Sequence, residues 1–244
     1  METLNVQLSA IDEERFGVRT AKASSVTLNQ LPAVIEFCRA NQVKFLIARC
    51  PAYELLTAQA MERQGFTLMD TLVYYSRRLA TAPIPPLADH LTIRPVRQEE
   101  AKQVSALTAK VFRSYQGHYH ADPQLDAEQS DAVYTSWAYR SVVSREVAHE
   151  VLVAEREGTI AGFITLRVHS PEAGEVPLYG VDPSVQGHGI GRNLIIGALR
   201  WFEAQNVVKM FISTQITNLS SQKVWVRLGF EPTQAHYTFH KWFD

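Results

Sequence analysis

The chain has 244 residues, of which 46% are hydrophobic and 20% are charged, and its formal net charge is −1. These values are typical of an ordinary globular protein with one large domain or two small ones. Because the net charge is near zero and no basic block occurs, electrostatics give no reason to expect binding to nucleic acid or to an anionic membrane.

The N-terminal residues and the cysteines indicate a cytoplasmic protein. The stretch "METLNVQLSAIDEERFG" has acidic residues where a signal peptide needs a basic start and an apolar centre. No apolar run approaches the roughly 20 residues of a membrane span. Cys38 and Cys50 lie in apolar surroundings without metal-type spacing, which favours buried, reduced thiols.

A proline-rich segment, residues 79–91, divides the chain. Its three prolines interrupt any regular helix or central strand. We therefore expect a smaller N-terminal domain over residues 1–80 and a larger domain over residues 91–244.

The two parts contain similar segments. Residues 45–75 have the pattern of a strand, a helix, the pair Gly65-Phe66 and a second strand, and residues 209–239 repeat this order around Gly229-Phe230. This similarity indicates an old duplication, in which only the second copy is preceded by a glycine-rich loop.

The larger part alternates extended and helical patterns, which predicts an α/β fold with a mixed sheet flanked by helices. A hairpin over residues 150–168 should turn at Glu157-Gly158. The other expected strands are 91–96, 175–181, 207–214 and 235–243, and the expected helices are 97–112, 190–205 and 218–228.

The segment "QGHGIG", residues 186–191, follows an expected strand and opens an expected helix. Glycines let a ligand approach the main chain, and the N–H groups of a helix N-terminus suit a phosphate. The segment lacks the Gly-Lys-Ser/Thr of a P-loop, and it lacks the third glycine and the later acidic residue of a dinucleotide fold. What remains is Gln186-x-x-Gly189-x-Gly191.

This motif resembles the pyrophosphate loop, Q/R-x-x-G-x-G/A, of the GNAT superfamily of acetyl-CoA-dependent N-acetyltransferases. Asn218, followed by Gly229-Phe230 eleven and twelve residues later, is similar to a second signature of that family. The resemblance implies a GNAT fold, with a mixed and mostly antiparallel sheet flanked by helices, after a degenerate GNAT-like half domain. It also implies acetyl-CoA as cosubstrate and no metal.

The resemblance assigns the cofactor contacts. The main chain around the loop would bind the pyrophosphate, the backbone of the preceding strand would pair with the pantetheine arm, and one of its N–H groups would face the thioester oxygen. Asn218 would contact the pantetheine, or cap its helix, or both. The residues concerned are Tyr179, Gly180, Val181, Gln186, Gly187, His188, Gly189, Ile190, Gly191, Arg192 and Asn218.

The family commonly uses a tyrosine four residues before the Gly-Phe pair to protonate the leaving thiolate, and this chain has Trp225 there. An indole N–H can donate a hydrogen bond but is not a usable acid. Tyr237, on the last strand, is our predicted replacement, with a plain strand aromatic as the alternative. Glu175 is a candidate general base, with an exposed strand-start carboxylate as the alternative.

The segments "RFGVRTAKA" (15–23), "HYHADP" (118–123) and "YTSWAYRSV" (134–142) carry a more distant resemblance, to bacterial GNAT enzymes that acetylate nucleotide-linked amino-deoxysugars such as TDP-fucosamine. It implies acceptor contacts from Phe16, Tyr119, His120 and Asp122. A metal site in "HYHAD" has no second ligand cluster to support it. Acceptors of another kind, a peptide or small amine, stay open, as do a silent CoA-binding module and a homodimer.

A second CoA site is not expected in the first copy. The positions that match Asn218, Trp225 and Tyr237 hold Glu54, Met61 and Val73, and no glycine loop precedes them.

Overall fold

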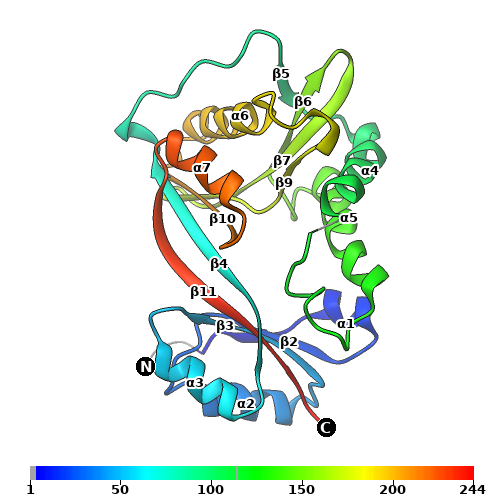
Figure 1. Cartoon of the computed structure of the whole chain (residues 1–244), viewed down its shortest axis with the longest axis vertical. Helices are drawn as coiled ribbons and strands as arrows, with labels where there is room; N and C mark the ends of the chain where they lie inside the picture. Colours follow the sequence, from blue (N-terminus) through cyan, green and yellow to red (C-terminus); the bar gives the residue numbers. More distant parts are fainter. Residues whose placement is uncertain (1–3, 114) are drawn as a thin grey trace. The chain divides into compact units, whose positions relative to one another are not determined.

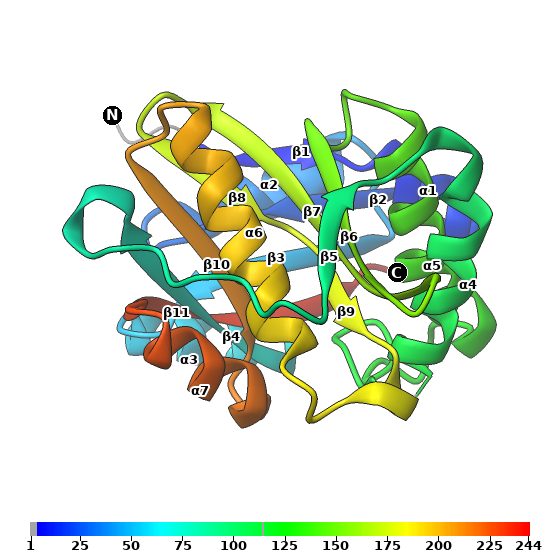
Figure 2. The ribbon, with the colours of Figure 1, turned by 90° about the horizontal axis from the view of Figure 1, so that it is seen from above.

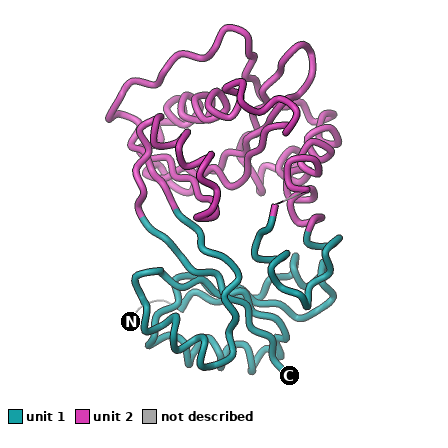
Figure 3. Tube along the Cα trace, in the orientation of Figure 1, with its two compact units in different colours: residues 1–73, 116–130, 234–244 teal, residues 74–115, 131–233 magenta. Residues whose placement is uncertain are grey.

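The computed structural model describes residues 4–113 and 115–244. Its internal contacts divide the chain into two compact units (Figure 3). Unit 1 consists of residues 1–73, 116–130 and 234–244, and unit 2 consists of residues 74–115 and 131–233. The predicted boundary at the proline segment differs from this division, because two later segments of the chain join the N-terminal residues.

Unit 1 is a sheet covered on one face by α2 (Leu31–Ala40) and α3 (Leu55–Arg63) (Figure 1). The strand order is β1 (Val6–Leu8), β2 (Thr20–Ala23), β3 (Phe45–Pro51), β11 (Glu231–Trp242) and β4 (Thr67–Arg78). The remaining helix is α1 (Ala10–Phe16).

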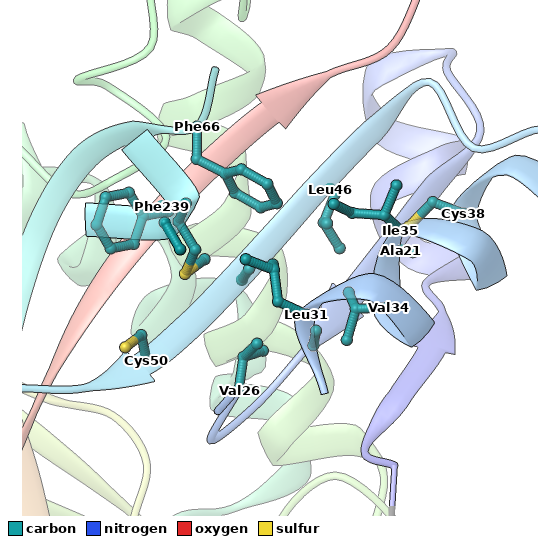
Figure 4. Close-up of a cluster of buried hydrophobic side chains, with 14 of the residues drawn as sticks. Ala21, Val26, Leu31, Val34, Ile35, Cys38, Leu46, Cys50, Phe66 and Phe239 are labelled. Atoms are coloured by element: carbon teal, nitrogen blue, oxygen red, sulfur yellow. The ribbon is translucent and has the colours of Figure 1, made fainter. Parts of the chain in front are cut away.

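The apolar core of unit 1 joins α2, α3 and one face of the sheet (Figure 4). Leu31 and Val34 on α2 pack against Leu46 of β3, while Phe239 comes from the last strand of the chain. Successive side chains of a strand point to opposite faces, so Phe239 and Tyr237 share this face and His236, Thr238 and His240 face away from it.

Unit 2 has helices on both faces of its sheet. Its strand order is β4, β10 (Lys209–Gln215), β8 (Ala173–Val176), β7 (Thr159–Ser170), β6 (Glu150–Arg156) and β5 (Thr92–Pro95), with β9 (Tyr179–Val181) paired to β7 alone. Figure 2 shows α6 (Ile190–Ala204) lying across the sheet. The other helices are α4 (Ala101–Phe112), α5 (Ala127–Val143) and α7 (Leu219–Arg227), with short 3₁₀ turns at Leu79–Thr81, Gln98–Glu100 and Pro183–Val185.

The predicted elements of unit 2 agree with the structure except at one strand. The hairpin turns at Glu157 and Gly158, both with positive φ, and the helix after the glycine loop begins at Ile190. The strand expected over 175–181 is instead split into β8 and β9 by Pro177 and Leu178, which makes the prediction of one strand wrong. Within the described ranges, no helix is long and apolar enough to cross a membrane.

The two similar segments form the same elements with the same lengths. β3, α3 and β4 have 7, 9 and 12 residues, and so do β10, α7 and β11. Lys209 follows Phe45 by 164 residues (209 − 45), and the same shift relates the ends of the other elements. Gly65 and Gly229 both have left-handed backbone conformations, with φ of 77° and 81°.

The last strand of each copy contributes to both units. In unit 1, Lys241 of β11 donates to the carbonyl of Gln64 at the end of α3 (2.8 Å). In unit 2, Arg77 of β4 donates to the carbonyl of Leu228 at the end of α7 (2.7 Å). The basic side chain that caps each of these helices therefore comes from the other copy, where it satisfies a terminal carbonyl.

Candidate functional site

Strand β9 has one paired and one unpaired edge. Its residues 179–181 pair antiparallel with residues 164–162 of β7. The preceding strand, β8, is paired on both sides, with β7 and with β10. In the part of the chain that the structure describes, no strand pairs with β9 on the side away from β7. The backbone groups of that edge can therefore pair with an extended ligand.

The divergence of β9 from β8 is fixed by Thr165 of β7. Its backbone N–H donates to the carbonyl of Leu178 at 2.8 Å, and its hydroxyl lies 3.0 Å from both the carbonyl oxygen and the nitrogen of Leu178. One side chain thus satisfies both backbone groups of Leu178 where the regular ladder is interrupted. Satisfied backbone groups allow the break to be buried.

The glycine loop leads into α6 beside this open edge. Gly187 and Gly189 have φ of 85° and 75°, a left-handed conformation that side chains other than glycine rarely adopt, and Gly189 is the N-cap of α6. The first N–H groups of α6 have no acceptor within the helix and form the positive end of its dipole. A Cβ on Gly191 would lie 3.6 Å from Val181, so the loop passes close to β9.

Asn193 holds the loop in place. Its buried side chain donates to the carbonyl of Gly189 at 2.9 Å and accepts from the backbone N–H of Ala88 at 2.8 Å. Gln186, His188 and Arg192 are exposed, and Ile190 is buried under the helix. The structure thus brings together the residues predicted to bind pyrophosphate, whose role stays a prediction.

Asn218 begins α7 and caps it, which confirms one of its two interpretations. Its side-chain oxygen accepts from the backbone N–H of Ser221 at 3.3 Å and from the hydroxyl of Ser220 at 3.0 Å. Its amide nitrogen donates to the hydroxyl of Thr214 on β10 at 3.0 Å. Contact with pantetheine, the other interpretation, stays a prediction.

A tyrosine hydroxyl reaches α7 from β9. Tyr179 donates to the hydroxyl of Ser221 at 2.7 Å, and its ring lies 6.3 Å from that of Trp225. Trp225 is fully buried, and its indole N–H lies beside the Tyr179 hydroxyl without a hydrogen bond of normal geometry. Burial raises the pKa of Tyr179, and Ser221 and Trp225 lower it by less.

A second tyrosine packs against the same tryptophan. The ring of Tyr75 lies 5.5 Å from that of Trp225, and its hydroxyl donates to the side chain of Gln222 at 3.1 Å. Tyr75 and Tyr179 therefore contact one indole, but their hydroxyls bind neighbouring residues of α7.

Glu175 lies on β8 in the same unit. Its carboxylate is 2.7 Å from Nε2 of His169, an exposed residue of β7. A Cβ on the neighbouring Gly174 would meet the ring of Phe202 on α6, so Glu175 points to the opposite face of the sheet. Its role as general base stays a prediction.

Tyr237 lies in unit 1. It pairs with Cys50 of β3, and its partly buried ring packs against the apolar core of that unit, 6.3 Å from the ring of Phe239. These contacts are those of the plain strand aromatic that was the alternative, and the catalytic role of Tyr237 stays a prediction.

The four residues predicted to contact the acceptor also lie in unit 1. The polar side-chain atoms of Tyr119 and Asp122 form hydrogen bonds with other residues of that unit. Tyr119 is buried and its hydroxyl donates to Asp12 at 2.9 Å. Asp122 is buried and accepts from Nδ1 of His240 at 2.7 Å and from the indole of Trp242 at 3.0 Å. Burial raises the pKa of Asp122, but these hydrogen bonds outweigh it and hold the pKa below its usual value. Phe16 packs on Tyr119, and His120 is partly exposed.

His118 completes this cluster. Its Nδ1 is 2.9 Å from Nε2 of His240, so the two histidines and Asp122 form a chain of hydrogen bonds. Burial lowers the pKa of His118 well below its ordinary value, and the charges of His240, Arg49, Lys22 and His120 lower it further. This chain gives Asp122 a structural role in unit 1.

Sequence reasoning missed several residues of the site. Thr165, Asn193 and Ser221 hold it through side-chain hydrogen bonds, and none belongs to a recognisable motif. For Asn193 the signal was available, because a polar residue on the apolar face of a predicted helix needs a partner. For the others, the partner lies too far along the sequence.

Comparison with known proteins agrees with this geometry. Residues 110–230 match the model of the acetyltransferase (GNAT) family. A mycothiol acetyltransferase from Acidothermus cellulolyticus is 30% identical over 196 residues, which cover 72% of this chain and 56% of that protein. The chain therefore spans little more than half of that relative. The spore coat polysaccharide biosynthesis protein SpsD from Bacillus subtilis is 21% identical over 207 residues, covering 83% of this chain and 68% of that protein.

A solved structure has the same fold. A tandem GNAT protein from the clavulanic acid biosynthesis pathway superposes with a TM-score of 0.64 at 17% identity, covering 93% of this chain and 76% of that chain. At this identity the likeness extends to the fold alone.

Proposed function

This chain belongs to the GNAT family of acetyltransferases, and we propose that its unit 2 transfers the acetyl group of acetyl-CoA to an amino group of an acceptor molecule. The observation that carries the proposal is the unpaired edge of β9 beside the N-terminus of α6. An extended pantetheine arm fits such an edge, and a pyrophosphate fits the free N–H groups of the helix.

In the proposed reaction, the neutral amine attacks the carbonyl carbon of the thioester. A backbone N–H of the β9 edge, among residues 179–181, donates to the carbonyl oxygen as negative charge develops on it. The carbon–sulfur bond then breaks, the sulfur receives a proton, and the amine nitrogen loses one. Glu175 is the proposed acceptor of the amine proton. Its proximity to His169 supports a proton path at that face of the sheet.

The proposed acceptor is a nucleotide-linked amino-deoxysugar. The similarity to SpsD supports a sugar acceptor, since the name of that protein refers to polysaccharide biosynthesis. The direct contacts once expected from Tyr119 and Asp122 receive no support, because Asp12 and His240 occupy their polar atoms.

A CoA-binding module without turnover is the second candidate. It is favoured by Trp225, which replaces the acid that the resemblance implies. A cytoplasmic location belongs to the proposal and is supported by two buried, free thiols, Cys38 and Cys50. A homodimer stays a prediction.

The test is a thiol-release assay with acetyl-CoA across nucleotide amino sugars, peptides and small amines. Release that depends on a nucleotide amino sugar, with an N-acetylated product, is expected. Turnover of peptides alone would overturn the acceptor. Tight acetyl-CoA binding without turnover of any amine would favour the silent module.

A further inference from the structure

The side-chain hydroxyl of Tyr179 in unit 2 takes no part in the reaction steps proposed above. We propose that the side chain of Tyr179 protonates the leaving thiolate, with Ser221 and Trp225 holding its oxygen. This inference rests on the proposed function and names the acid of that same site.

Tyr179 lies where the thioester is proposed to bind. Tyr179 is the first residue of β9, so its main chain belongs to the open edge where the thioester is proposed to bind. Gly180 faces α4, since a Cβ there would meet Val111, and its neighbours Tyr179 and Val181 therefore face the other side of the sheet. The Tyr179 hydroxyl lies on that side, beside the first turn of α7.

The Tyr179 hydroxyl also lies close to Trp225. Ser221 and Trp225 are four residues apart on α7, which places them on one face of the helix, one turn apart. The hydroxyl of Tyr179 lies between these two side chains. A phenol from β9 thus reaches the part of α7 where the resemblance led us to expect a phenol at position 225.

A buried phenol has the acidity that this step of the reaction needs. A proton donor for a thiolate, whose conjugate acid has a pKa of about 8.5, must be protonated at neutral pH and still acidic enough to react. Burial keeps Tyr179 protonated, and none of the groups that shift its pKa is charged. When the hydroxyl gives its proton to sulfur, the phenolate oxygen can accept from the Ser221 hydroxyl and from the Trp225 indole, whose N–H is buried there without a well-formed hydrogen bond.

The acetyl transfer balances in electrons and protons without another reactant. The electron pair of the carbon–sulfur bond goes to sulfur, and the proton of Tyr179 follows it to give the free thiol of CoA. The proton that Glu175 has accepted from the amine nitrogen then passes through water to the phenolate, which restores both side chains. Ser221 and Trp225 are positioning residues, because they act through the oxygen of Tyr179.

The experiment compares Tyr179→Phe with Tyr75→Phe in the full chain. Tyr75 is the matched control, because its ring packs on the same indole and its hydroxyl binds the next residue of α7. With the acceptor found by the thiol-release panel, Tyr179→Phe should lower kcat by about 10²–10⁴-fold at unchanged acetyl-CoA affinity, while Tyr75→Phe leaves kcat near that of the unaltered protein. Ser221→Ala should lower kcat less and move the alkaline limb of the kcat profile to higher pH.

A second readout needs no acceptor. If Tyr179 donates to sulfur, the unaltered protein should bind CoA more tightly, relative to acetyl-CoA, as the pH rises toward the pKa of the thiol. Calorimetry should find this rise in Tyr75→Phe and lose it in Tyr179→Phe. Normal turnover and a preserved rise in Tyr179→Phe would overturn the inference, and a large loss of kcat in Tyr237→Phe alone would assign the acid to Tyr237. Failure of the unaltered protein to bind acetyl-CoA would instead overturn the proposed function, and this inference with it.

Discussion

Residues 45–78 and 209–242 form the same three elements with the same lengths, but among the described residues only the second copy lies beside a strand, β9, that leaves the ladder and leads into a glycine loop. In each copy a short strand pairs in parallel with the first of the three, β2 with β3 in unit 1 and β8 with β10 in unit 2. The difference arises in the segment that follows this short strand.

In unit 1 the chain turns back at once. The backbone N–H of Val26 donates to the carbonyl of Arg49 on β3 at 2.9 Å, and the Val26 side chain is buried. In unit 2 the chain instead continues into β9, which moves away from β10 and leads into the glycine loop. Among the described residues, the same framework therefore has a diverging strand and a glycine loop beside it in unit 2 but not in unit 1, and the connecting segment makes the difference.

The sharpest test of this comparison is Gly189→Asp. A carboxylate beside the proposed pyrophosphate should weaken acetyl-CoA binding about 100-fold or more, because like charges a few ångströms apart repel by several kcal/mol even at intermediate dielectric. Since no glycine loop precedes β3 in the first copy, we expect calorimetry to find no second class of site that survives.

Gly158→Asp is the matched control, because Gly158 has the same φ of 75° and nothing within 4 Å of an added Cβ. Both variants place a new charge on a left-handed backbone, so strain alone should affect them similarly. Residual binding at half the original stoichiometry in Gly189→Asp would reveal a second site and contradict the comparison.

The basic side chains that cap a helix of the other copy, Arg77 and Lys241, give a second test. Arg77 is buried and donates to the carbonyls of Leu228, Ala82 and Pro83, so Arg77→Ala should lower the free energy of unfolding by about 3 kcal/mol. Lys241 is partly exposed and donates to the carbonyl of Gln64, so Lys241→Ala should cost only about 1 kcal/mol. Urea unfolding measures both. Equal losses of unfolding free energy in the two variants would contradict the prediction that the buried cap contributes more.

The third and smallest effect concerns acid stability. The buried histidines, His118, His236 and His240, all belong to unit 1. Because the pKa of His118 is lower in the folded than in the unfolded chain, its contribution is intact above pH 6.5. Below that pH the unfolded state takes up a proton that the folded state does not. Stability should then fall by up to about 1.4 kcal/mol per pH unit.

His118→Asn should remove this part of the pH dependence, because asparagine can still hydrogen-bond to His240 but does not titrate in this range. His188→Asn, in the exposed glycine loop, serves as the control. Unfolding curves in urea at pH 5 to 8 compare the variants. A slope that persists in His118→Asn would assign the acid sensitivity to other groups, His236 first.

Local patterns explain what could be predicted from the sequence. The hairpin at Glu157-Gly158, the loop from Gln186 to Gly191 and the cap at Asn218 depend on neighbouring residues, and they occur where we expected them. The position of β11 beside β3 could not be predicted, because an extended pattern does not reveal its partner strand.

The hydrogen-bond partners of the side chains could not be predicted either. Tyr179 meets Ser221 only because the strand expected at 175–181 breaks at Pro177, and Asp122 meets His240 only because β11 joins unit 1. Each contact joins residues far apart in the sequence and depends on the tertiary structure, so composition and periodicity contain no record of it.

The place of β11 also sets an order of events during synthesis. Unit 1 contains the N-terminal residues, yet its sheet and its core need residues 234–244, which leave the ribosome only after all of unit 2. Domains usually fold as they emerge, the first before the second. Here the earliest residues have to wait, with the edge of β3 and the apolar face of α2 exposed, until the last strand arrives. The emergence of residues 234–244, more than that of residues 1–73, should therefore limit how fast unit 1 becomes native.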